Sequence, residues 1–228
     1  MKKLVLALAA ILGLCTTSMH AQEPPESTDF SRWQIRVRGV GAVVNSSADV
    51  ATIGGDVRVT NHFIPELDIT YFFTENLAAE LILGTTKHSV NTVGSDLTAL
   101  GIADPTNVDL GSVRLLPPTL TAQYHFRPEA TAIAKPYVGA GVTYALFYDA
   151  KAGNTVADVS YDNAFGLATQ AGIDFMLTDT FFFNVDVKYI FLKTDVSVNA
   201  TNLAEGLHIP ASVKLNPFLF GFGVGMKL

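Results

Sequence analysis

The sequence predicts an all-β protein, an eight-stranded antiparallel transmembrane β-barrel with short periplasmic turns and long external loops. Three observations lead to this prediction. Apolar side chains recur at every second position over most of the chain, a period typical of strands rather than helices. Most of these segments reach the roughly 9–11 residues that a tilted strand needs to cross a bilayer. Short and long connections alternate between them, as in barrels that span an outer membrane.

The expected strands each carry one apolar face. In the first, Trp33, Ile35 and Val37 share that face, and in the seventh, Phe181 and Phe183 begin it. In chain order the eight strands are expected at 33–44, 65–74, 77–89, 118–126, 136–148, 163–177, 181–194 and 213–228. The alternation alone predicts strands, and the connections predict how they are arranged.

The connections differ in length in a regular way. Those at 74–76 and 178–180 are tight, and the one at 127–135 is modest. The others are long and polar or mixed, and cover 45–64, 90–117, 149–162 and 195–212. All long connections of an antiparallel barrel then share one end, and an even strand count places both termini at the other.

The N-terminal residues are typical of an export signal. Lys2 and Lys3 precede an apolar run at 4–14, and Ala21 is a small residue suited to cleavage. We therefore expect a signal peptide at 1–21, a flexible lead-in at 22–32 and the barrel at 33–228. The single cysteine, Cys15, falls in the signal, so no disulfide is expected in the mature chain.

The charge balance argues against a nucleic-acid partner. The chain has 15 basic and 21 acidic residues, a formal net charge of −6, and no basic stretch interleaved with aromatic residues. Four of the five histidines, His62, His88, His125 and His208, lie beyond the expected signal, and none has a neighbour at metal-ligand spacing. We expect no metal, no cofactor and no catalytic residues, and therefore no enzyme.

A soluble ligand-binding barrel would show the same alternation as a membrane barrel. The strand face with fewer apolar residues, called the weaker face, decides between these two kinds of barrel. A soluble barrel covers its outside with Lys, Glu and Ser, whereas here the weaker face is rich in Gly and Ala, as in Gly139, Gly141, Gly221 and Gly223. Small residues make room inside a narrow barrel. The apolar, aromatic face is therefore predicted to contact lipid, and the weaker face to line the lumen.

The lumen is predicted to have two levels. Toward the periplasm we expect a polar floor formed by Arg36, Arg38, Glu80, His125, Asp174, Asp186 and Lys188, whose opposite charges can pair. Toward the outside we expect an apolar lumen that includes Val40, Val44, Phe147, Ile190 and Leu192. Glu66, Asp68 and His88 are charged or polar exceptions at this upper level.

Four stretches resemble the outer membrane protein W family. They are LDITYFFTENLAAEL (67–81), LGSVRLLPPTLTAQYHF (110–126), KPYVGAGVTYALFY (135–148) and VKLNPFLFGFGVGMKL (213–228), in order along nearly the whole mature chain. The resemblance implies an eight-stranded barrel of the bacterial outer membrane with a hydrophobic channel, uptake of small hydrophobic molecules and their sideways release into the membrane. It implies no catalytic residues. Family members commonly end on an aromatic residue, whereas this chain ends on Leu228.

Two functions from different classes follow. In the first, the barrel gives small hydrophobic molecules passive entry through the apolar, externally open lumen above the polar floor. In the alternative, the external loops bind a surface partner, and the lumen is only a packed core. Under either hypothesis the expected partners include outer-membrane lipid and the barrel-assembly machinery during insertion, and under the first also small hydrophobic solutes.

Overall fold

The computed structural model describes residues 31–44, 47–50, 56–59, 62–93, 108–127, 132–154, 156–201 and 205–228. The predicted signal peptide at 1–21 and residues 22–30 of the lead-in lie outside the described residues. Across the described ranges, no helix has the length and apolar character that crossing a membrane requires.

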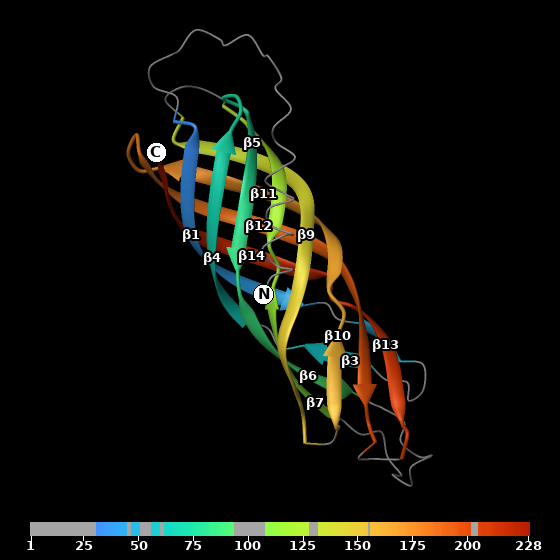
Figure 1. Ribbon diagram of the computed structural model, residues 1–228. Coiled ribbons are helices and arrows are strands. Elements are labelled where there is room, and N and C mark those ends of the chain that lie inside the picture. Colours follow the sequence, from blue (N-terminus) through green and yellow to red (C-terminus); the bar gives the residue numbers. More distant parts are fainter. Residues whose placement is uncertain are drawn as a thin grey trace. The chain divides into compact units, whose positions relative to one another are not determined.

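Eight strands close into an antiparallel barrel, as predicted (Figure 1). They are β1 (Trp33–Val44), β4 (His62–Phe72), β5 (Leu77–Gly84), β8 (Thr119–His125), β9 (Ala134–Ala152), β11 (Ala164–Met176), β12 (Phe181–Asn199) and β14 (Pro217–Lys227). Each pairs with the next in the chain. The last strand returns to the first, with β14 and β1 paired from Gln34↔Lys227 to Val44↔Pro217. Closure gives each of these strands a partner on both sides, which a β-structure in lipid requires.

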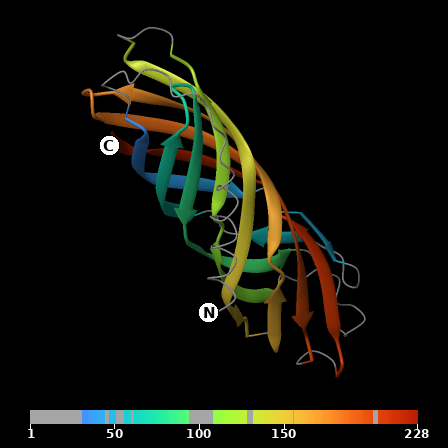
Figure 2. The ribbon, with the colours of Figure 1, turned by 45° about the horizontal axis from the view of Figure 1, so that its top comes forward.

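Among the described residues, six further strands continue the sheet, and they extend beyond one end of the barrel (Figures 1 and 2). They are β2 (Ser47–Val50), β3 (Asp56–Val59), β6 (Thr86–Val93), β7 (Asp109–Leu116), β10 (Asp158–Tyr161) and β13 (His208–Lys214). Most of their residues fall in stretches expected to be loops. The long strands β9 and β12 support them, because β7 pairs with the outer part of β9, and β10 and β13 pair with the outer part of β12.

Two of the predicted strands are interrupted where they leave the barrel. The predicted strand at 77–89 divides at Thr85 into β5 and β6, and the predicted strand at 213–228 divides at Leu215 and Asn216 into β13 and β14. The positive φ of Asn216 bends the backbone at the second break. Between β7 and β8 lie Pro117 and Pro118, which have no N–H to donate to a ladder.

The two tight turns have the same construction. After β4, the Thr74 hydroxyl accepts hydrogen bonds from the backbone N–H groups of Asn76 (3.3 Å) and Leu77 (3.0 Å). After β11, the Thr178 hydroxyl accepts from Thr180 (3.2 Å) and Phe181 (2.9 Å). Each threonine thereby satisfies two donors that no strand reaches, which fixes the short connection.

Burial alternates along the barrel strands in the predicted sense. On β12 the odd-numbered side chains Phe181, Phe183 and Phe191 are exposed, while the even-numbered Asn184 and Lys188 are buried. Large apolar side chains therefore face outward and charged ones inward. This pattern is the reverse of a water-soluble barrel, and it suits a barrel surrounded by lipid.

Candidate functional site: an apolar chamber above a polar floor

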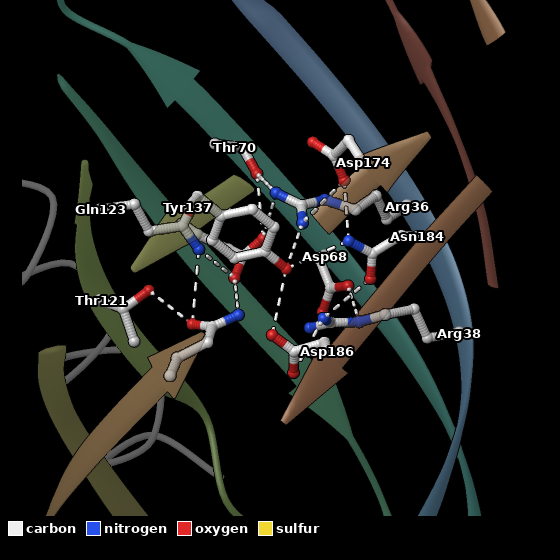
Figure 3. A network of polar contacts seen from close by, with 12 residues as sticks. Arg36, Arg38, Asp68, Thr70, Thr121, Gln123, Tyr137, Asp174, Asn184 and Asp186 are labelled. Atoms are coloured by element: carbon white, nitrogen blue, oxygen red, sulfur yellow. Dashed lines mark hydrogen bonds and ion pairs between the residues drawn. The ribbon is translucent and has the colours of Figure 1, made fainter. Parts of the chain in front are cut away.

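Arg36, which β1 directs into the lumen, is the centre of the first half of the floor (Figure 3). Its Nη2 lies 2.8 Å from Glu80 Oε1 and donates to the Thr70 hydroxyl at 3.1 Å. Its Nη1 donates to Tyr137 Oη at 2.9 Å and lies 3.8 Å from Asp174 Oδ1. The guanidinium, with no exposed surface, thus contacts strands on several sides of the lumen.

Arg38 is the centre of the second half. Its Nη2 lies 2.8 Å from Glu66 Oε1, its Nε 2.6 Å from Asp68 Oδ2, and its Nη1 3.1 Å from Asp186 Oδ1. Lys188 Nζ donates to the same Glu66 Oε1 at 3.1 Å. One arginine therefore holds three carboxylates that come from β4 and β12.

Neutral groups join the two halves and complete the floor. Asn184 Nδ2 donates to Asp174 Oδ1 (2.7 Å) and to Tyr137 Oη (3.1 Å), while Tyr137 donates to Asp186 Oδ2 (3.0 Å). Gln123 and Gln170 each donate through Nε2 to Glu80 Oε2, at 2.6 and 2.9 Å. Buried charges with this many partners keep one arrangement, because each lost contact leaves a desolvated group.

All seven residues predicted for the floor are buried, and six of them take part in its ion pairs: Arg36, Arg38, Glu80, Asp174, Asp186 and Lys188. The seventh, His125, is bonded through Nε2 to Gln123 Oε1 (2.9 Å), and its ring stacks on Tyr137 with centroids 4.9 Å apart. These seven residues were expected in the floor from residue type and strand parity, and the structure buries them all on the lumen side.

Glu66 and Asp68 were expected at the upper level, but the structure places them in the floor. The register of β1 against β4 sets Arg38 opposite Glu66 and Arg36 opposite Asp68. The predicted strand began at Pro65 and made these the first residues of a strand, whereas β4 begins three residues earlier. Tyr137 was not identified either, although its parity with Gly139 and Gly141 already directed it inward.

A cavity extends outward from the floor. All five residues predicted for the apolar lumen line it: Val40, Val44, Phe147, Ile190 and Leu192. Glu66 and Lys188 line it too, so the outer surface of the floor closes its inner end. We call this cavity, together with the residues that line it, the chamber.

The chamber continues into the strands beyond the barrel, which sequence reasoning missed. There its wall includes Val90, Val113, Val196, Val198, Ile209 and Val213, all buried. The signal was present, because the alternation of β12 runs on past position 194 with Val196 and Val198 on the inward parity. In this outer part Tyr161 packs on Phe147 with ring centroids 5.5 Å apart, and burial raises the pKa of Tyr161 to about 12. The phenol therefore stays neutral, in keeping with the apolar wall.

Among the residues that the structure describes, no group of three or more His, Cys, Asp or Glu side chains is arranged to hold a metal ion. What the arrangement offers is an apolar wall above a floor of ion-paired side chains.

Comparisons with known proteins agree with this architecture. The profile of the OmpW family matches residues 32–228. An uncharacterized outer-membrane protein of Sinorhizobium fredii, y4mB, is 42% identical over 86% of this chain and 79% of its own length. Outer membrane protein W of Vibrio cholerae is 32% identical, with all of both chains covered. Neither name denotes an enzyme.

A solved structure shows the same fold. The crystal structure of the outer membrane protein OprG from Pseudomonas aeruginosa superposes with a TM-score of 0.76 at 23% sequence identity. The superposition covers 88% of this chain and 97% of OprG.

Proposed function

Because the chain belongs to the OmpW family and forms a β-barrel of the bacterial outer membrane, we propose that it gives small hydrophobic molecules passive entry through the chamber. The observation that carries the proposal is the sharp division of the lumen. Walls of Val, Ile, Leu and Phe face the space above the floor, and a set of charged side chains joined by ion pairs lies beneath it.

The apolar wall supports binding of molecules of matching chemistry. Transfer of apolar surface from water to an apolar wall is favourable by about 25 cal/mol per Å². An ion or a sugar would lose hydration at this wall and find few partners. Selection for apolar solutes therefore needs no moving part.

The floor supports a route that does not run straight through. Arg36, Tyr137, Phe72 and Phe182 are among the largest fully buried side chains, and all four belong to barrel strands. A solute that enters from outside then leaves by another way. We place the exit where two ladders of the wall meet. The ladder between β5 and β8 stops at Ile82↔Thr119, and the ladder between β6 and β7 begins at Thr86↔Leu115. Gly84, Thr85 and Pro117 of this stretch line the chamber.

The proposal is tested by placing a charge in the chamber wall. Leu192, 4% exposed, lines the chamber, so Leu192→Asp puts a carboxylate in the path of the solute. We expect cells that produce this variant to take up the hydrophobic dye N-phenylnaphthylamine no faster than cells without the protein. Ser197→Asp adds the same charge on the exposed face of the same strand and should leave uptake unchanged.

Heat-modifiable electrophoretic mobility of the outer-membrane fraction establishes that both variants are inserted. Normal dye uptake by an inserted Leu192→Asp variant would contradict entry through the chamber.

A further inference from the structure

Two pairs of basic side chains face each other across neighbouring strands on the outer surface. Lys193 of β12 is the register partner of Lys214 of β13, and Lys87 of β6 is the register partner of Arg114 of β7. All four side chains are exposed. Like charges directly opposite one another destabilise a sheet, so the two pairs call for an explanation that the fold alone does not supply.

Each pair lies where the lipid-facing apolar surface ends. On β12 the outward side chains from Phe181 to Phe191 span 11 residues without a charge, and Lys193 is the next outward residue. On the neighbouring strands, Lys214 precedes the outward Phe218 and Phe220. An 11-residue strand is about the length that crosses a bilayer. The pair is therefore at the level of the external lipid headgroups.

The same position recurs for the second pair. The outward face of β5 is apolar through Leu81 and Leu83, and Lys87 of β6 is the first charged residue that follows on that face. On the adjoining strands, Arg114 lies beyond the outward Leu120 and Tyr124. Both pairs thus lie at the external edge of the lipid-facing apolar surface, on different sides of the barrel.

The two pairs differ in whether they already have an anionic partner. Arg114 Nε is 3.1 Å from Asp149 Oδ2, so this arginine already has an anionic partner. Neither Lys193 nor Lys214 forms an ion pair within the described parts of the chain. The nearest acidic residue along β12, Asp195, accepts a hydrogen bond from the Ser212 hydroxyl at 2.7 Å.

We propose that Lys193 and Lys214 form a binding site for a phosphate group of an anionic lipid in the external leaflet, with Lys87 and Arg114 as a second, weaker site. Side chains opposite each other across antiparallel strands have Cβ atoms about 4.5–5.5 Å apart. Two flexible ammonium groups at that spacing can contact one phosphate from both sides. The phosphate removes the repulsion between them, and the lipid's acyl chains lie along the aromatic residues below.

The experiment compares zwitterionic phosphatidylcholine with the same lipid plus an anionic, phosphorylated lipid. The full-length protein is reconstituted in phosphatidylcholine vesicles, alone or with added diphosphorylated lipid A, and the midpoint of its heat-induced mobility change is measured. We expect lipid A to raise the midpoint of the wild type by several degrees, and less so at high salt because exposed charges are screened. In K193Q/K214Q we expect less than half of that gain. In phosphatidylcholine alone the double variant should be at least as stable as the wild type, because its repulsion is gone.

Three controls decide the assignment. R32Q/K227Q removes the same charge at the opposite end of the barrel and should keep the full gain. An equal gain in the wild type and in K193Q/K214Q would overturn the site. A full gain with dephosphorylated lipid A would overturn recognition of phosphate, and a full gain with inorganic phosphate alone would overturn the lipid as its source. None of these outcomes depends on solute entry through the chamber.

Discussion

The burial of Arg36 and Arg38 is the main stability question at the scale of single residues. Both side chains lie in the lumen with essentially no exposed surface and contact five carboxylates between them. Each charge costs several kcal/mol to desolvate, and the ion pairs offset this cost only while they stay complete. Removing one partner of a buried ion pair should therefore destabilise the floor more than replacing both partners together.

Arg36→Met should lower the free energy of unfolding by about 3–5 kcal/mol, because it leaves Glu80 buried without its cation. Urea unfolding in detergent micelles measures the change. Adding Glu80→Gln should recover part of the loss. Arg114→Met removes an arginine from a half-exposed pair with Asp149 and should cost no more than about 1 kcal/mol. Equal losses for Arg36→Met and Arg114→Met would contradict a floor held by buried charge.

At the scale of elements, the closure between β1 and β14 depends on how closely two backbones approach. Gly221 and Gly223 of β14 have the same parity, but their surroundings differ. A Cβ on Gly223 would overlap the Val37 carbonyl oxygen and the Arg38 backbone, whereas a Cβ on Gly221 would have Val40 Cγ2 as its nearest neighbour at 3.5 Å. The glycines of the last strand therefore serve different purposes, and only Gly223 permits close contact of backbones.

Gly223→Ala should destabilise the barrel by about 1–3 kcal/mol, since neither backbone can yield without disturbing the closing ladder. Gly221→Ala should have little effect, because the added methyl group makes an ordinary van der Waals contact. The fraction of each variant that shows heat-modifiable mobility, together with its urea midpoint, gives the measurement. If Gly221→Ala is as unstable as Gly223→Ala, then the space for side chains in the lumen, rather than the close approach of the two backbones, is what requires glycine.

On the scale of the whole molecule, the barrel combines an outward-facing chamber, a closed floor and an interrupted stretch of wall. The register on the two sides of the interruption is the same, since Ile82↔Thr119 and Thr86↔Leu115 continue one another. Thr85 and Leu116 are therefore opposite each other, although no ladder pairing joins them. This continuity allows the wall to be closed by a designed crosslink.

A disulfide in T85C/L116C should slow dye uptake when oxidised, and reduction should restore it, because residues opposite each other across strands lie within disulfide reach. L81C/L120C places the same crosslink in an intact part of the ladder and should not change uptake in either state. If the oxidised T85C/L116C barrel takes up dye as fast as the reduced one, the exit lies elsewhere.

The sequence by itself determined the strand parity and, through the alternation of short and long connections, the eight-stranded barrel. Parity is a local property, because alternation along one strand sorts its side chains into two faces whatever the neighbours are. Only the tertiary structure decided which charges meet. The register of β1 against β4 brings Glu66 and Asp68 down to the arginines, and the register of β12 against β13 brings Lys193 opposite Lys214. Register depends on pairing between two strands, and a predicted start of β4 that was three residues too late was enough to hide it.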